Sequence, residues 1–174
     1  SFLGNQTNFS SGPFQVTSTT KYADAGRKQR VEFFAPLGEL TWHEHCLASG
    51  WRYEPFADDR ASTRDSCCLP DCRTNGIPTE IKMWTGWKSG EFPENLPVQI
   101  PANSLAFRDQ FEAGRFVMIN MDGTHAVIVS FDIDPIRMVE TNSHSHASGK
   151  MFSAQYELSQ CRQIELKKIQ KTLN

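Results

Sequence analysis

Hydrophobic residues are concentrated in the last third of the chain, where short apolar runs are separated by turn-forming residues. Phe116 to Met121 and Ala126 to Phe131 are rich in Val, Ile and Phe, and Asp122-Gly123 lies between them. Asp-Gly between two apolar runs is the strongest short-range signal for a β-hairpin. The pattern therefore predicts two antiparallel strands here.

A third apolar run, Ile136 to Glu140, follows Asp134-Pro135, a pair that favours a turn. His125 begins the second predicted strand, and Glu140 to Asn142 ends the third. If these strands are antiparallel neighbours, the two ends lie close together and a carboxylate or amide can hydrogen-bond to the imidazole. A histidine oriented in this way can act as a general base.

The rest of the chain predicts one clear helix and several shorter elements. Residues 104–114 have an apolar face, polar capping residues and a terminal glycine, which favour a helix. A helix that begins at Cys46 is brief at best, because Gly50 and Pro55 follow closely, and a β-strand over residues 40–47 is the alternative. Further strands are predicted over residues 31–34, 80–87 and 152–158, and residues 164–173 are compatible with either helix or strand.

These elements predict an α+β fold, an antiparallel β-rich single domain with one or two helices. The alternative is an all-β barrel or sandwich. A chain of 174 residues with 39% hydrophobic content fits one domain with its own core. We expect residues 1–174 to form that domain, with residues 1–20 as a loose N-terminal arm.

Charge and hydropathy narrow the classes of partner. The formal net charge is -2 and no basic block is present, so nucleic acid is not expected as a partner. No apolar run approaches the roughly 20 residues of a membrane-spanning helix, so we expect a soluble protein without a membrane span. A protein or peptide is the expected substrate or partner, and no cofactor is expected.

Two features favour an extracellular location. Asn5 and Asn8 each begin an N-glycosylation tripeptide in a Ser/Thr-rich segment. The loop-like sequence around the clustered cysteines favours disulfides, and two bridges among four cysteines would leave Cys46 as the odd thiol. Those four are Cys67, Cys68, Cys72 and Cys161. The first 20 residues lack signal-peptide features, so a secreted chain would already be processed; a reduced cytosolic protein with five free cysteines is the alternative.

One histidine-containing motif resembles a known family. Thr124-His125-Ala126-Val127 opens a predicted strand, and Glu140-Thr141-Asn142-Ser143 follows after a turn, with Asn142 seventeen positions after His125. This order and spacing are similar to those of the papain-like cysteine peptidases. The resemblance implies a thiol hydrolase or deamidase acting on an amide bond, with Cys46 as nucleophile, His125 as base, and Asn142 or Glu140 orienting the imidazole.

The chain departs from the family pattern at several positions. Gly50 and Pro55 follow Cys46, where the family has a long helix that begins at its cysteine, and no glutamine lies close before Cys46. His144-Ser145 replaces the Trp-Gly that should follow the asparagine and serine. Cys161 is a competing nucleophile, because permuted members of the superfamily place the cysteine after the histidine.

Two other functions compete with the hydrolase. His43-Glu44-His45 and His144-Ser145-His146 are His-x-His pairs, and on a strand this spacing places both imidazoles on one face, as in cupin-like metal sites. No acid lies between Cys46 and Gly50, although the cupin pattern has a glutamate there. The other alternative is a secreted β-rich ligand- or partner-binding protein, lipocalin-like or an effector, without catalysis.

Overall fold

The computed structural model describes residues 35–56, 69–142 and 149–170. It contains the helices α2 (Ala35–Ala48) and α3 (Ala106–Gln110) and the 3-10 turns η5 (Ala102–Leu105) and η6 (Leu158–Gln160). The strands are β1 (Tyr53–Pro55), β2 (Cys72–Thr74), β3 (Ile77–Met83), β4 (Val98–Pro101), β5 (Arg115–Ile119), β6 (His125–Ser130), β7 (Arg137–Asn142), β8 (Lys150–Tyr156) and β9 (Arg162–Glu165).

The strands form two sheets. The larger has the order β1-β2-β3-β5-β6-β9, and all its pairs are antiparallel except β3 with β5. The smaller is antiparallel and has the order β4-β8-β7. The described strands do not close into a barrel, so the predicted α+β class is confirmed.

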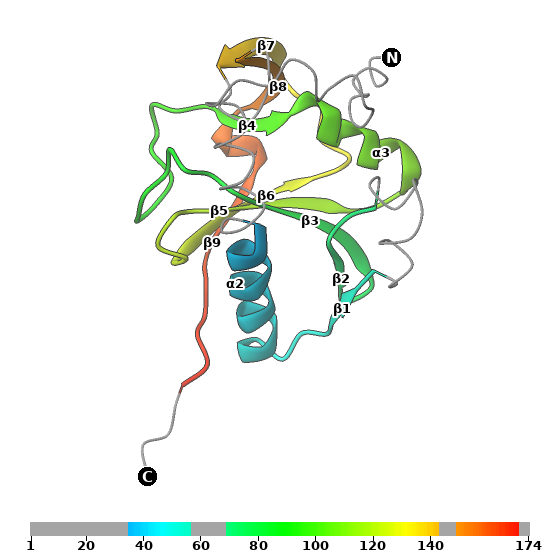
Figure 1. Cartoon of the computed structure of the whole chain (residues 1–174), viewed down its shortest axis with the longest axis vertical. Coiled ribbons are helices and arrows are strands. Elements are labelled where there is room, and N and C mark those ends of the chain that lie inside the picture. The colour runs from blue at the N-terminus through cyan, green and yellow to red at the C-terminus, as the bar shows by residue number, and fades with distance from the viewer. Residues whose placement is uncertain (1–34, 57–68, 143–148, 171–174) are drawn as a thin grey trace.

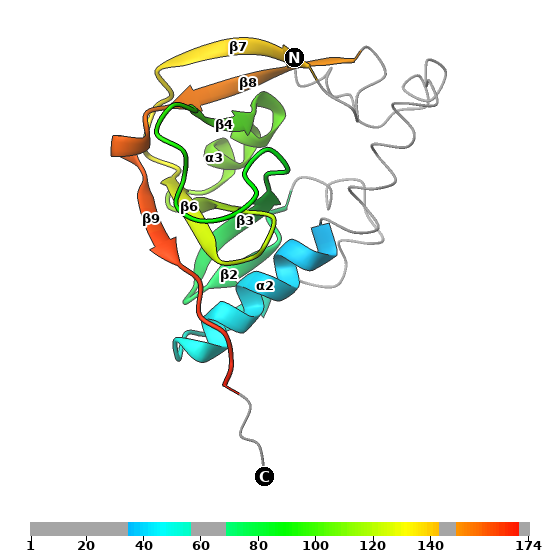
Figure 2. The ribbon, with the colours of Figure 1, turned by 90° about the vertical axis from the view of Figure 1, so that its left-hand side faces the viewer.

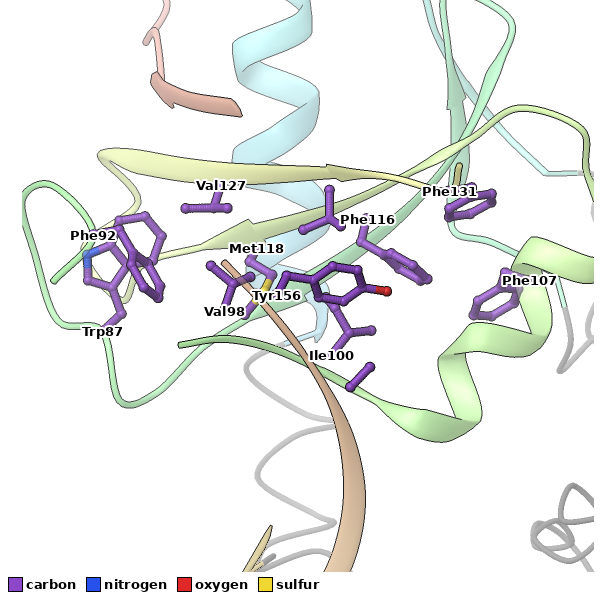
Figure 3. Packing of buried hydrophobic residues seen from close by; sticks show 12 residues of the cluster. Trp87, Phe92, Val98, Ile100, Phe107, Phe116, Met118, Val127, Phe131 and Tyr156 are labelled. Carbon is purple, nitrogen blue, oxygen red and sulfur yellow. The ribbon is translucent and has the colours of Figure 1, made fainter. Parts of the chain in front are cut away.

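The large sheet lies between two layers (Figures 1 and 2). Helix α2 covers one face, where Trp42 of the helix packs with Ile119 of the sheet. The small sheet covers the other face, where Val127 of the large sheet packs with Val98 and Tyr156 (Figure 3). Because side chains alternate along a strand, neighbouring residues of one strand enter different cores.

Helix α2 is longer than the sequence predicts. It has 14 residues, and Pro36 lies in its first turn, where a missing backbone N–H costs no helical hydrogen bond. Gly50 follows the helix with a φ of 72°, and Trp51 N–H donates to Cys46 O. The predictions of a brief helix from Cys46 and of a strand over residues 40–47 were therefore wrong, because Cys46 lies near the end of a helix that begins at Ala35.

The predicted hairpin is present, but its third strand is not. β5 and β6 pair antiparallel, as the Asp-Gly signal indicated. β7 pairs with β8 in the small sheet, and the outer neighbour of β6 is β9. The expectation that β7 lies beside β6 was wrong, because Asp134-Pro135 leads the chain out of the large sheet rather than back along it. The predicted helix over residues 104–114 is shorter, formed by η5 and α3.

Within the described residues, no helix combines the length and the apolar composition needed to cross a bilayer.

Candidate functional site

Cys46 lies at the C-terminal end of α2, not at its start. Its side chain is fully buried in the core between α2 and the large sheet. Burial raises the pKa of the Cys46 thiol to about 11, although a hydrogen bond with Thr74 and the charge of Arg115 act in the opposite direction. The C-terminal end of a helix dipole also disfavours a thiolate. Cys46 is therefore a neutral thiol that solvent does not reach.

His125 lies on the other face of the large sheet. In β6, Ala126 and Ile128 belong to the core that contains Cys46, whereas Val127 belongs to the opposite core. Side chains alternate along a strand, so His125 shares the face of Val127. The sheet thus separates His125 from Cys46, and the structure does not bring this predicted pair together.

Glu140 and Asn142 lie in the small sheet. Asn142 is the last residue of β7, is exposed, and pairs with Lys150 at the first residue of β8. Glu140 is exposed, and one of its carboxylate oxygens lies 4.0 Å from Lys150 Nζ. Among the described residues, the groups that hydrogen-bond to the His125 ring do not include these two side chains. The imidazole is oriented from a different part of the chain.

Cys161 is also remote from His125. It precedes β9, whose Glu165 pairs with His125, so about four residues at roughly 3.3 Å each separate the two positions along the strand. Cys46, Cys72 and Cys161 are all free thiols, and Cys67 and Cys68 lie outside the described residues. The predicted disulfides that involve Cys72 and Cys161 are not formed in the structure.

The first His-x-His pair lies on a helix rather than a strand. His43 stacks on Tyr53 with ring centroids 4.1 Å apart, whereas His45 is buried against Trp51. Residues two apart on a helix point in different directions. His144 and His146 lie outside the described residues, and no group of three His, Cys, Asp or Glu among those described could hold a metal ion.

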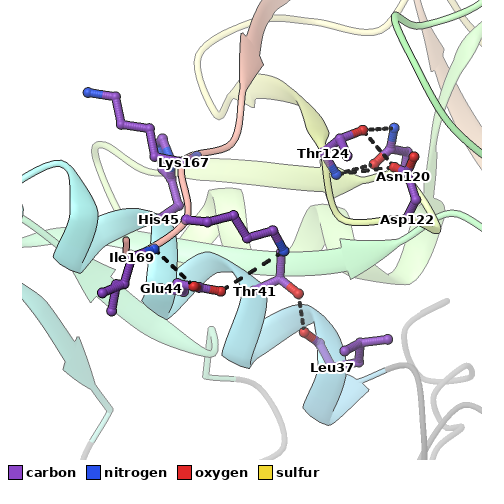
Figure 4. A network of polar contacts seen from close by, with 10 residues as sticks. Leu37, Thr41, Glu44, His45, Asn120, Asp122, Thr124, Lys167 and Ile169 are labelled. Atoms are coloured by element: carbon purple, nitrogen blue, oxygen red, sulfur yellow. Dashed lines mark hydrogen bonds and ion pairs between the residues drawn. The ribbon is translucent and has the colours of Figure 1, made fainter. Parts of the chain in front are cut away.

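A chain of hydrogen bonds in the β5–β6 turn holds the His125 ring. Thr124 Oγ1 lies 2.8 Å from His125 Nδ1 and donates to Asp122 Oδ1 at 2.6 Å. Asn120 Nδ2 donates to the same Thr124 oxygen at 3.1 Å. Figure 4 shows the Asn120, Asp122 and Thr124 part of this arrangement. The carboxylate that reaches His125 through Thr124 is therefore that of Asp122.

The hydrogen bonds also determine the tautomer of His125. A threonine hydroxyl has one proton, and the short contact with Asp122 uses it, because a carboxylate can only accept. Thr124 Oγ1 then accepts hydrogen bonds from Asn120 Nδ2 and from His125 Nδ1. In neutral imidazole the second nitrogen is then an acceptor. Nε2 of His125 therefore carries a lone pair.

Asn120 fixes this turn to the neighbouring loop. Its side chain is fully buried, and Oδ1 accepts the backbone N–H groups of Thr124 and His125 at 2.9 and 3.1 Å. Its Nδ2 donates to Gly90 O at 3.2 Å, and Met121 N–H donates to Trp87 O at 2.8 Å. The loop that carries Trp87 is thereby held against the turn that carries His125.

A pocket of about 360 Å³ lies beside His125. Its lining residues are Trp87, Glu91, His125, Ala126, Gln163, Ile164 and Glu165. Glu165 pairs directly with His125 across β6 and β9, so both side chains lie on the same face of the sheet. As far as the structure describes the chain, the lining contains two carboxylates and neither lysine nor arginine.

Comparison of the chain with protein-family models, with curated proteins and with solved structures finds no match in any of the three.

Several residues of this site are absent from the sequence-based prediction. The sequence predicts Asp122 as a turn residue and Thr124 as part of the histidine motif, without a role for either side chain, although polar side chains directly before a strand-opening histidine are a signal that could identify them. Glu91 and Glu165 carry no such signal, because Glu91 lies in a loop and Glu165 reaches His125 through the pairing of β9 with β6, which joins positions forty residues apart. The sequence thus singled out His125 without the groups that surround it.

Proposed function

We propose that the protein is a binding protein that recognises a basic side chain, the ammonium or guanidinium group of a peptide or protein partner, in the pocket beside His125. The proposal depends on one observation: His125, whose Nδ1 is engaged by Thr124, lines a pocket together with Glu91 and Glu165. An N–H donor of the ligand would meet an imidazole acceptor and two carboxylates. A cation is the ligand that satisfies all three groups.

The expected affinity is modest. Glu91 and Glu165 are exposed, and an ion pair with an exposed carboxylate contributes about 0.2–1 kcal/mol. A hydrogen bond to a charged donor adds about 1.5–3 kcal/mol. The sum for two ion pairs and one such hydrogen bond is about 2–5 kcal/mol, which corresponds to a Kd between about 0.2 and 40 mM for an isolated side chain. A partner protein would need further contacts around the pocket.

The test uses two short capped peptides, Gly-Lys-Gly and its norleucine analogue, titrated against the full chain while backbone amide shifts are followed by NMR. We expect saturable shifts at Trp87 and Glu165 with the lysine peptide alone. Glu165→Gln keeps the shape of the side chain and should weaken binding about two- to fivefold. Glu94→Gln is the matched control, because Glu94 is exposed and does not line the pocket. Equal shifts with both peptides would contradict the proposal.

General-base catalysis is a second candidate, and the Asp122–Thr124–His125 chain favours it. An imidazole held through Nδ1 can take a proton from water at Nε2 while the water oxygen attacks the carbonyl carbon of an ester or amide. The imidazolium then gives this proton to the leaving alcohol or amine as its bond to the carbonyl carbon breaks, and neutral His125 is restored. Cys46 has no part in this reaction, since it lies buried across the sheet. The second candidate is therefore a hydrolase that uses His125 as its base and does not use Cys46 as a nucleophile.

A panel of ester and amide substrates separates the two candidates. For catalysis, His125→Gln should lower kcat/KM by about a hundredfold or more, whereas Cys46→Ala should leave it within about threefold. If the protein binds its ligand without catalysis, the native chain should hydrolyse these substrates no faster than His125→Gln does.

A further inference from the structure

The chain after β9 is held against α2 by side chains of the helix. Lys167 N–H donates to His45 Nδ1 at 2.9 Å, and Ile169 N–H donates to Glu44 Oε2 at 3.0 Å. Lys168 Nζ lies 4.0 Å from the other Glu44 oxygen. Figure 4 shows this segment beside the helix, and Figure 2 shows it running past the end of α2. Two helix side chains therefore accept hydrogen bonds from backbone N–H groups of this segment, as the carbonyl groups of a neighbouring strand would in a sheet.

His45 is an unusual acceptor because its ring is enclosed. The residue is 3% exposed, and its ring centroid lies 5.1 Å from those of both Trp42 and Trp51. Since Nδ1 accepts the Lys167 N–H, the ring proton is on Nε2, which is buried and has no hydrogen-bond partner among the described residues. The surroundings of the ring therefore favour its neutral form.

Protonation of His45 and the Lys167 hydrogen bond exclude each other. A second ring proton must go to Nδ1, whose lone pair the Lys167 N–H already occupies. Burial, and then the charge of Lys167, lower the pKa of His45 from its ordinary 6.5. The charged groups around it are Lys167 and Lys168 of the C-terminal segment and Glu44 on the helix, while Trp42 and Trp51 are uncharged neighbours.

We propose that His45 is a proton-sensitive latch, which holds residues 167–170 against α2 at neutral pH and releases them when its ring is protonated. The release begins after Leu166, whose side chain is buried and whose N–H donates to Thr124 O at 2.8 Å. When residues 167–170 leave the helix, the groove of about 590 Å³ between this segment and α2 opens. The lining residues of this groove are Leu47, Ala48, Lys167, Lys168, Ile169 and Gln170.

Amide hydrogen exchange of the full chain tests the latch, measured between about pH 7.5 and about pH 4.5 and corrected for intrinsic rates. We expect the Lys167 amide to lose protection at the lower pH while the Leu166 amide keeps it, because protonation of the His45 ring removes the Nδ1 acceptor. The Leu166 amide is the internal reference. A constant ratio of the two protection factors would overturn the proposal.

Two variants separate His45 from Glu44. In His45→Asn, the amide oxygen takes the place of Nδ1 and does not titrate, so the Lys167 amide should stay protected at both pH values. In Glu44→Gln, the amide oxygen can still accept the Ile169 N–H, and the response to pH should remain. Loss of the response in Glu44→Gln would overturn the assignment to His45; if His45→Asn does not fold, the native measurement alone decides.

Discussion

At the scale of single residues, the buried side chain of Asn120 joins the β5–β6 turn to the loop that carries Trp87. Its amide satisfies two backbone N–H groups, the Thr124 hydroxyl and the Gly90 carbonyl. A buried amide with all these partners stabilises both segments. Asn120 therefore stabilises the turn in which Asp122 and Thr124 orient the His125 ring.

Asn120→Ala should destabilise the protein by about 2–4 kcal/mol, because it leaves buried or half-buried donors and an acceptor without partners. Urea unfolding measures the change. Asn95→Ala is the control, since Asn95 is exposed and should change stability by less than about 0.5 kcal/mol. A similarly small effect for Asn120→Ala would contradict the role given to this residue.

Gly114→Ala tests close packing at the start of β5. A Cβ at residue 114 would overlap the ring of Phe131, whose backbone N–H donates to Gly114 O. The ring is buried and can shift only by disturbing the core, so we expect a loss of about 1–3 kcal/mol. Thermal unfolding measures the change. An unfolding midpoint of Gly114→Ala equal to that of the native protein would contradict this packing.

At the scale of elements, α2 has apolar residues on both sides. Trp42 is fully buried and its Nε1 donates to Thr74 Oγ1 at 2.9 Å, whereas Leu40 is 66% exposed. This mixture explains why the sequence did not reveal the full helix, since apolar residues on both faces obscure the helical period.

Strand pairs joined by a short turn were predictable, as with β5 and β6. Pairs determined by packing at long range, as with β6 and β9, were not.

Trp42→Phe should cost about 2–3 kcal/mol, from the lost hydrogen bond to Thr74 and the smaller ring. Leu40→Gln, two residues earlier on the same helix, should change stability by less than about 0.5 kcal/mol. Urea denaturation of the two variants in parallel gives the comparison. Equal destabilisation would mean that α2 packs on the sheet through a different face.

At the scale of the whole molecule, two ionisable groups with little solvent exposure, His45 and Glu80, make stability depend on pH in opposite directions. The pKa of His45 is lowered, so its contribution is greatest above 6.5 and declines as the pH falls. Burial raises the pKa of Glu80 to about 7; Lys82 opposes this shift, and the Asp71 carboxylate adds to it. Glu80 therefore favours the folded state at low pH, and this contribution is lost as the pH rises from 4.5 to about 7.

Glu80→Gln should separate the two effects. The Glu80 side chain is 14% exposed and lies 3.2 Å from Lys82 Nζ, and a neutral amide there avoids the cost of ionisation. We expect the variant to be more stable than the native protein at about pH 8, by on the order of 3 kcal/mol, and similar to it at about pH 4. Chemical denaturation at both pH values measures the free energy of unfolding of the two proteins. If Glu80→Gln were more stable than the native protein only at low pH, the raised pKa of Glu80 would be contradicted.

The most direct test of the binding site is the nitrogen-15 spectrum of the His125 ring at neutral pH, recorded during titration with the Gly-Lys-Gly peptide. The Asp122–Thr124–His125 chain predicts a proton on Nδ1 and none on Nε2, with the Nε2 resonance moving as the peptide binds. A proton on Nε2, or an Nε2 resonance that the peptide does not move, would contradict the proposed binding of a basic side chain.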